Sequence, residues 1–310
     1  MYDTNKDGIY DKKESISTGY DVHIGFSGHN LSGLIEGPDG KIYWQIGDIG
    51  ANITAKNSET FSHPNEGILA RSNPDGSDFE IFASGIRNTH EFIFDDFGNL
   101  ISSDNDGDYH GESERLVHIV EGYDSSWRSN WQYGKYTDPK NNTYNVWMSE
   151  KLHKPRFEDQ AAYIIPAIVN FHNSPTGMLY SPGTALGSAW KNKFFVVEFV
   201  GGANASGIWS FGLKPKGAYF DLDGDKSIIK GVLATGIRFG LEGAMYIADW
   251  VTSQDTKNYG RVWKLDVTEN DLEAARKETN ALMLLNYSQQ TNPKLLELLG
   301  FQDSRIRQMA

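Results

Sequence analysis

The sequence predicts an all-β chain of repeated antiparallel sheets, of the β-propeller type, that ends in a short α-helical segment. A short strand motif recurs four times, and each copy is followed by a second β-rich run. From Thr268 onward the β-rich pattern gives way to the apolar spacing of helices. Short strands bounded by tight turns are typical of propellers and of β-sandwiches.

Each copy of the strand motif begins with a turn residue and ends with an acid. Three copies place the acid six positions after the turn residue, and the first copy is two residues longer. Because the order of the four strand pairs is maintained along the chain, we favour a propeller over a generic β-sandwich. The motifs are Gly40 to Asp48, Gly98 to Asp104, Asn192 to Glu198 and Gly243 to Asp249, and the second strands are Gly67 to Ala70, Arg115 to Ile119, Gly207 to Phe211 and Gly260 to Leu265.

The last part of the chain predicts three helices. Thr268 is placed to cap a helix that continues through Asn286, and Asn292 with Pro293 begins a second helix that ends at Gly300. Asp303 and Ser304 begin a third. Paired short helices are typical of helical-repeat arrays. We therefore expect a propeller domain over residues 1–266 and the start of a HEAT-like repeat over 267–310.

Composition narrows the function classes. The chain of 310 residues carries 41 acidic and 29 basic side chains, a formal net charge of −12, and this disfavours a nucleic-acid-binding role. It has no cysteine, so thiolate catalysis, cysteine-ligated zinc and covalently attached c-type haem are excluded from it. No apolar run approaches the roughly 20 residues of a membrane span. No signal peptide precedes the first acidic loop, so we expect an N-terminally incomplete propeller cut from a longer polypeptide.

The N-terminal loop has the spacing of a calcium site. Twelve residues from Asp3 to Glu14 place oxygen ligands at loop positions one, three and five, glycine at six, a backbone carbonyl at seven and a carboxylate at twelve. The predicted calcium ligands are Asp3, Asn5, Asp7, Ile9 and Glu14. A solvated acidic turn is the alternative.

A second acidic run reads Asp104-Asn105-Asp106-Gly107-Asp108. Alternating carboxylates can converge on one cation, and Asp104 and Asp108 are the candidate metal ligands here. The same residue types also form ordinary turns.

The stretch HNLSGLIEGPDGKIYWQIGDIG, from His29 to Gly50, resembles the quinoprotein glucose and sorbosone dehydrogenase family. So do Gly85-Ile-Arg87-Asn88 and the later runs FIFDDFGNLISSDNDGD and SERLVHIVEGYDSSWR. Members are six-bladed propellers that use pyrroloquinoline quinone (PQQ) with calcium. The layout is most similar to large proteins of environmental bacteria described as membrane-bound dehydrogenases, which continue into helical repeats and a cytochrome c domain.

The resemblance implies a set of site residues. His29 matches the general base, and Asp48, nineteen residues on, matches the acid that orients it. Arg87 and Asn88 match cofactor-lining positions, and Asp106 and Gly107 match the loop whose carbonyls hold the cofactor-linked calcium. The alternative for His29 is a structural histidine whose hydrogen bond is satisfied by Asp48. The alternative for Arg87 and Asn88 is that they pin their loop in place.

The sequence departs from the family at the cations that pair with the PQQ carboxylates. Gly201 and Gly202 stand where the glucose enzymes carry a lysine, in the run VVEFVGGANASG. An expected arginine pair is replaced in the region of Ala234-Thr235-Gly236, and Arg238 is nearby but out of register.

The sequence thus predicts a quinoprotein-type oxidoreductase that oxidises a sugar or polyol alcohol with PQQ and Ca²⁺. The resemblance further implies electron transfer to a cytochrome c and a periplasmic or secreted location. Two alternatives stay open: a non-catalytic, calcium-stabilised propeller that binds glycans or proteins, and a calcium-dependent lactonase whose metal would use Asp104, Asn105 and Asp106.

Overall fold

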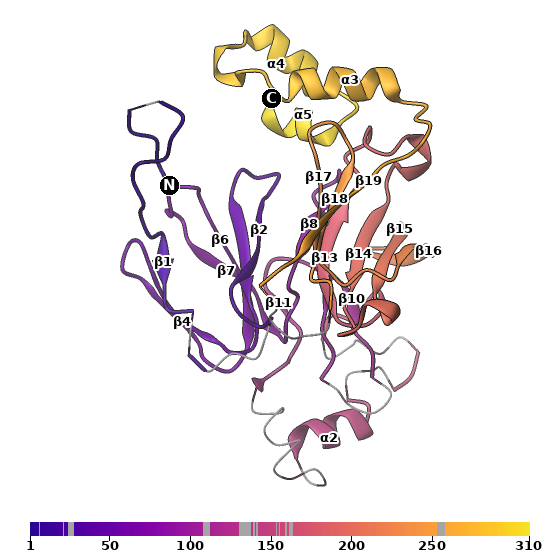
Figure 1. The fold of residues 1–310 in the computed structure, drawn as a ribbon. Helices are drawn as coiled ribbons and strands as arrows, with labels where there is room; N and C mark the ends of the chain where they lie inside the picture. The colour runs from indigo at the N-terminus through magenta and orange to yellow at the C-terminus, as the bar shows by residue number, and fades with distance from the viewer. Residues whose placement is uncertain are drawn as a thin grey trace. The chain divides into compact units, whose positions relative to one another are not determined.

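The chain, described here from a computed structural model, forms two compact units of mostly β structure (Figure 1). Unit 1 comprises residues 1–88 and 120–165, and unit 2 comprises residues 89–119 and 166–310. The structure describes all residues except 6, 21, 24–27, 108–111, 130–137, 139, 141, 153, 155, 159, 161–163 and 253–257.

Unit 1 contains a five-stranded and a three-stranded sheet among its described residues. The larger has the order β11-β7-β6-β3-β2, with β11 parallel to β7 and the other pairs antiparallel. The smaller has the order β1-β4-β5. The bounds are Ser17–Thr18 (β1), Ser32–Glu36 (β2), Ile42–Ile46 (β3), Ala51–Ala55 (β4), Thr60–His63 (β5), Gly67–Ser72 (β6), Glu80–Ile86 (β7) and Tyr123–Asp124 (β11), with one helix, Thr143–Ser149 (α2).

A single apolar cluster joins the two sheets of unit 1. Trp44 and Ile46 of β3 and Ile68 of β6 pack with Ile53 of β4. Strand β4 alternates buried and exposed residues, so one face supplies the core and the other faces solvent. This packing fixes the end of β3, where Gly47 and Asp48 follow.

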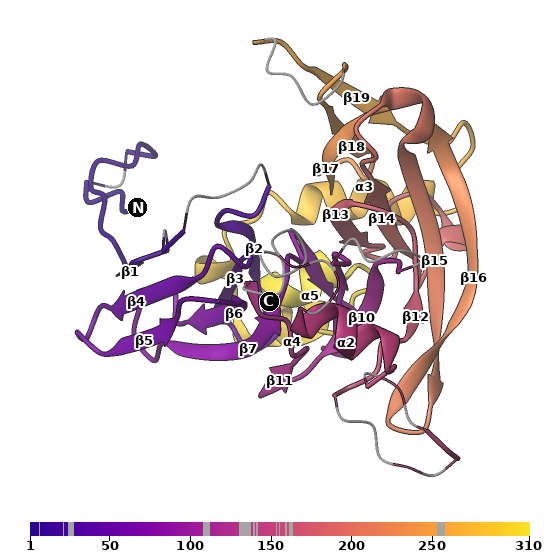
Figure 2. The same cartoon turned by 90° about the horizontal axis from the view of Figure 1, so that it is seen from below.

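Unit 2 contains three further sheets among its described residues. Their orders are β12-β10-β9-β8, β13-β14-β15-β16 and β17-β18-β19, all antiparallel. Figure 2 shows β15 and β16 as a long hairpin. The bounds are Phe92–Phe94 (β8), Leu100–Asp104 (β9), Arg115–Ile119 (β10), Val169–Asn170 (β12), Pro175–Tyr180 (β13), Phe194–Glu198 (β14), Gly207–Lys216 (β15), Tyr219–Lys230 (β16), Ala234–Phe239 (β17), Met245–Asp249 (β18) and Arg261–Leu265 (β19).

Strand β14 shows how these sheets stack. Phe194 and Val196 enter a core shared with β9 and β10, whereas Phe195 and Val197 enter a core shared with β17 and β18. Successive residues of a strand point to opposite faces, so a strand buried on both faces reads as a continuous apolar run. The middle sheet of unit 2 is therefore covered on both sides, as a propeller blade is.

The repeated motif predicted the strands correctly. Its four copies form β3, β9, β14 and β18, and each pairs with the predicted second strand, β6, β10, β15 and β19. Its first residues, Gly40, Gly98, Asn192 and Gly243, have φ values of 75°, 80°, 57° and 85°. The left-handed region is open to glycine and tolerated by asparagine, so these residue types mark the turn.

The predicted helices form after β19, but both boundaries of the first one are corrected: it begins later than expected and ends at Leu282, not at Asn286. The helices are Glu273–Leu282 (α3), Asn292–Leu298 (α4) and Ser304–Met309 (α5), and the carboxylate of Asp303 caps α5. Thr268 does not cap α3, which begins five residues later. Asp271 instead accepts hydrogen bonds from the backbone and hydroxyl of Ser188, and this tethers the connecting segment to the β structure.

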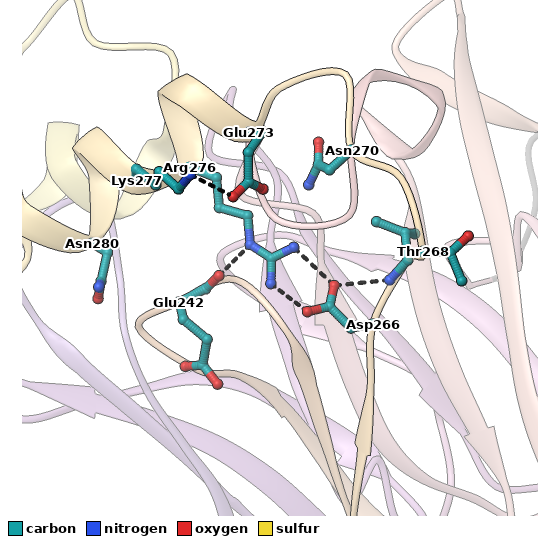
Figure 3. Close-up of a pocket in the computed structure, with 9 residues that line it drawn as sticks. Glu242, Asp266, Thr268, Asn270, Glu273, Arg276, Lys277 and Asn280 are labelled. Atoms are coloured by element: carbon teal, nitrogen blue, oxygen red, sulfur yellow. Dashed lines mark hydrogen bonds and ion pairs between the residues drawn. The ribbon is translucent and has the colours of Figure 1, made fainter.

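The helices are attached to the sheets of unit 2 by charged side chains. Figure 1 shows α3, α4 and α5 gathered at one end of β17 and β18. Arg276 of α3 donates to both carboxylate oxygens of Asp266, at 2.8 and 2.6 Å, and to the carbonyl of Glu242 (Figure 3). Arg305 of α5 donates to the carbonyl of Gly240 at 2.8 Å.

The observed fold is thus mostly β, with several small antiparallel sheets like propeller blades and short helices at the C-terminal end. Closure into a six-bladed ring, and a domain boundary at residue 266, stay predictions. No helix of the described residues is long and apolar enough to cross a membrane.

Candidate active site

The two residues predicted as base and orienting acid meet in unit 1. The Nδ1 atom of His29 lies 2.7 Å from Oδ1 of Asp48. Their side chains are 12% and 11% exposed, so both are largely removed from water and neither is sealed off. Nδ1–H donates to the carboxylate, which leaves the Nε2 lone pair as the acceptor of the ring. Nε2 has no hydrogen-bond partner among the described residues, and it is not a fully buried atom.

Backbone contacts hold the two side chains together. The amide of Gly47 donates to the carbonyl of His29 at 3.0 Å, and the amide of Asp48 donates to the carbonyl of Arg87 at 2.8 Å. A Cβ atom on Gly47 would lie 2.8 Å from the His29 carbonyl oxygen and 3.1 Å from that of Arg87. Only glycine allows this close approach of three backbone segments.

Trp127, which the sequence analysis missed, completes the site. Its indole Nε1 donates to Oδ2 of Asp48 at 2.8 Å, and its side chain is buried. The Arg87 guanidinium lies 5.6 Å from the centroid of the Trp127 ring, within the range of a cation–π contact. Trp127 is 79 residues from Asp48, and no spacing rule connects an indole to a carboxylate at that separation.

Two of the three acids that end the other repeats bind an indole as Asp48 does, whereas the third, Asp104, pairs with Arg115. Glu198 accepts from the indole of Trp209 at 2.9 Å, and Asp249 accepts from that of Trp263 at 2.8 Å. An acid-to-indole bond is therefore a recurring structural device at this position. Glu198 also has an imidazole near its other oxygen, with Nδ1 of His172 at 3.9 Å from Oε1. Asp48 differs in the short contact of 2.7 Å that its second oxygen makes with His29.

The side chain of Asn88 contacts two other segments of unit 1. Its Nδ2 donates to the carbonyl of Gly28 at 3.0 Å, next to His29, and its Oδ1 lies 3.4 Å from Nε2 of Gln45. The amide therefore contacts the backbone next to His29, an arrangement compatible with both the cofactor-lining and the loop-pinning interpretation, and the choice between them stays open. Arg87 and Asn88 are both buried.

The loop matched to the cofactor-linked calcium lies in unit 2. The Gly107 amide donates to Oε2 of Glu112 at 2.9 Å, and Asp106 is partly buried. Asp104 is buried and ion-paired with Arg115 at 2.5 Å. Asp108 lies outside the described residues.

The described part of the N-terminal loop forms a turn held by its own acidic side chains. Asp3 accepts from the amides of Asp7 and Gly8, and Asp7 accepts from the amide of Ile9. Glu14 pairs with Lys56 at 3.2 Å, and this interaction holds its pKa below the ordinary value. The described residues of the loop, Asn5 included, are exposed apart from the half-buried Asp3. Among the described residues, no group of three or more histidine or acidic side chains stands ready to hold a metal ion, so calcium binding stays a prediction.

The residues fit a quinone cofactor in part. Unit 1 contains the pair predicted as base and orienting acid and a buried guanidinium, that of Arg87, which suits quinone or carboxylate oxygens. Unit 2 lacks the predicted cations: Gly201 and Gly202 have no charge to offer, and Arg238 makes a two-point ion pair with Glu91, at 3.0 Å for each bond. The pair expected to handle the proton is therefore present in the chain, and the cations expected to pair with the PQQ carboxylates are not found at their expected positions.

The model of the DUF7133 family, a domain of unknown function, matches residues 1–226. The chain belongs to this family. No curated protein matches it.

Solved structures show a distant similarity of the DUF7133 chain to sugar dehydrogenase propellers. A Thermus thermophilus protein, described as an oxidoreductase of the glucose dehydrogenase type, is 15% identical, with a TM-score of 0.48 over 75% of this chain and 65% of that one. The PQQ-bound aldose sugar dehydrogenase of Streptomyces coelicolor is 14% identical, with a TM-score of 0.46 over 76% of this chain and 62% of that one. A gluconolactonase from Xanthomonas campestris is 11% identical, with a TM-score of 0.32 over 71% and 69%.

The chain therefore spans less than two thirds of the length of the Thermus and Streptomyces proteins. At these identities and TM-scores, no residue role transfers from those proteins to this one.

Proposed function

We propose that this chain carries the proton-abstracting site of an oxidoreductase that acts on a sugar or polyol alcohol. The observation that carries the proposal is the His29 imidazole, fixed through Nδ1 by Asp48 while Nε2 is left available as a base. The motifs from His29 to Gly50 and around Arg87, which resemble the quinoprotein sugar dehydrogenases, support it further.

In this proposal Nε2 of His29 accepts the proton of a substrate hydroxyl. Removing that proton raises the electron density on the carbinol carbon, so the C–H hydrogen leaves more readily as hydride. A quinone such as PQQ, when bound, supplies the hydride acceptor. Asp48 keeps the imidazole in the Nδ1–H tautomer and stabilises the imidazolium that forms, and Trp127 keeps Asp48 in place through Oδ2.

Calcium in the N-terminal loop belongs to the same proposal, with a structural role. Electron transfer to a cytochrome c and a periplasmic or secreted location rest on the sequence resemblance alone.

The test is dye reduction by the chain with PQQ, CaCl₂ and a panel of aldoses and polyols. His29→Gln should lower kcat by about 10²- to 10⁴-fold, the range of a positioned general base. His63→Gln is the matched control, because His63 also pairs with an acid of unit 1, Glu66, at 2.9 Å, but lies outside the site. Absence of turnover, together with no spectral change on adding PQQ, would exclude the proposal.

One observation favours a second candidate, a non-catalytic propeller that binds glycans or proteins. The predicted cofactor cations are missing at Gly201 and Gly202, and Arg238 is committed to Glu91. A chain that binds a carbohydrate and reduces no dye under any condition would support this candidate. The lactonase alternative gains no support, because Asp104 is committed to Arg115.

A further inference from the structure

A cavity of about 420 Å³ lies within unit 2, between the sheet that contains β9 and β10 and the sheet that contains β13 to β16. It continues the apolar core between these sheets toward their turns. Its volume falls in the range of roughly 300–1,000 Å³ that small-molecule sites occupy. Every residue that lines it belongs to unit 2, whereas His29 and Asp48 belong to unit 1.

Six aromatic rings stand on the cavity lining, those of Phe97, His118, Tyr180, Phe194, Tyr219 and Phe220. Tyr180 and Phe194 lie with ring centroids 4.7 Å apart, and Phe220 meets the ring of His118 edge to face at 5.2 Å. Phe97 stands in the turn between β8 and β9 with 85% of its surface exposed. A large aromatic side chain left in water at the edge of an aromatic cavity is suited to close over a bound ring.

Two polar side chains of the lining, those of His118 and Asn192, have donors or acceptors that make no hydrogen bond within the described residues. The imidazole of His118 is half-buried and has no hydrogen-bond partner among the described residues. Burial lowers the pKa of His118, so at neutral pH the ring offers one donor and one acceptor. Asn192 uses Oδ1 to accept from the Tyr180 hydroxyl at 3.3 Å, and its Nδ2 has no partner among the described residues.

The charge of the lining excludes one class of ligand. None of the described lining residues is a lysine or an arginine, and the Asp95 carboxylate stands on the lining. That carboxylate accepts from the amides of Phe97 and Asn99, so it is held in place by its own turn. Anionic ligands would meet an uncompensated negative charge.

The hydrogen-bond donors decide between cationic and neutral ligands. A quaternary ammonium ion suits aromatic rings but accepts no hydrogen bond, so Nδ2 of Asn192 and the N–H of His118 would stay unmatched. A hydroxyl group both donates and accepts, and the C–H face of a pyranose ring packs on the negative face of an aromatic ring.

We propose that this aromatic cavity is a binding site for a neutral carbohydrate, with Phe97 packing on a pyranose ring and His118 and Asn192 contacting its hydroxyls. The site stands whether or not His29 is catalytic, since none of its residues takes part in the proposed proton transfer.

The test is isothermal titration calorimetry of the whole chain with methyl β-D-glucopyranoside and cellobiose. The methyl glycoside has no free anomeric hydroxyl, so its binding is measured apart from oxidation at that carbon. Choline chloride is the probe for a cation site. Phe97→Ala should weaken glycoside binding about fivefold to tenfold, the effect of losing one aromatic contact, and His118→Phe should do the same through its hydrogen bonds.

Two variants serve as controls. Phe157→Ala removes another exposed phenylalanine, this one from unit 1, and should leave glycoside affinity unchanged. His29→Gln should lower any dye reduction as stated above, and Phe97→Ala should weaken glycoside binding by the same factor in that variant as in the wild type, so failure of the oxidoreductase proposal and failure of this one give different results. If His118→Phe does not fold, as judged by thermal melting, Phe97→Ala decides alone, because its side chain is in solvent.

The proposal is overturned if neither glycoside binds at millimolar concentration. It is also overturned if glycosides bind with equal affinity to the wild type and Phe97→Ala, or if choline binds in their place.

Discussion

Replacing Trp127 by phenylalanine tests how much the hydrogen bond from the indole to Asp48 stabilises the fold, apart from the packing of the aromatic ring. The change removes one N–H donor from Oδ2 of Asp48 and keeps an aromatic ring under Arg87. Hydrogen bonds to charged groups contribute about 1.5–3 kcal/mol, and a buried acceptor that loses its donor carries the full cost of desolvation. We expect a loss of about 2 kcal/mol in the free energy of unfolding, roughly a 30-fold change in the equilibrium constant.

The assay is urea unfolding of Trp127→Phe beside Trp263→Phe. Trp263 makes the same bond to Asp249 at 2.8 Å. Asp249 is also buried, but it keeps two other partners when the indole is lost, Arg261 at 3.3 Å and the amide of Val251 at 2.8 Å. The Trp263 variant should therefore lose less than about 1 kcal/mol. Equal losses in the two variants, or a loss below about 0.5 kcal/mol for Trp127→Phe, would refute the claim that Trp127 fixes a buried Asp48.

Three further changes probe other parts of the structure. Gly47→Ala should lower the free energy of unfolding by about 1–3 kcal/mol in a denaturant titration, because its Cβ would lie 2.8 Å from the His29 carbonyl; a variant as stable as wild type would contradict this close approach. Burial lowers the pKa of His118 and of His172, which faces Glu198 and Asp225, so the unfolded chain binds more protons below about pH 6.5 and the melting temperature should fall from pH 7.5 to pH 5.5; a flat profile would speak against buried neutral imidazoles. Calcium at 100 times its Kd should stabilise the chain by about 2.7 kcal/mol and Asp3→Asn should lose this gain, whereas an unchanged melting temperature on adding calcium would leave the loop as an acidic turn.

The sequence was informative wherever a local conformation demanded a residue type. The left-handed turns at Gly98 and Asn192 admit few residues, and the β-rich runs after them can be buried on two faces only in stacked sheets. The pairing of His29 with Asp48 was also predictable, since both residues lie in one stretch that resembles a known family.

Contacts between distant segments could not be read from the sequence in the same way. Trp127 binds Asp48, which is 79 residues away in the sequence. The helix cap expected from Thr268 does not form, and the nearby Asp271 binds Ser188, which is 83 residues away. The aromatic cavity gave no signal either. Asn99, Asn192 and Phe194 belong to copies of the repeated motif, but Tyr180 and Phe220 come from other strands, and no motif joins the two sets.

The most direct test of the central claim is the protonation of the two nitrogens of His29 at neutral pH. Long-range ¹H–¹⁵N correlation spectra of the labelled chain, assigned with His29→Gln, report which nitrogen carries the proton. We predict a protonated Nδ1 and a bare Nε2, with Asp48→Asn altering that pattern. A proton on Nε2 in the wild type would leave no base facing a substrate and would contradict the proposed chemistry.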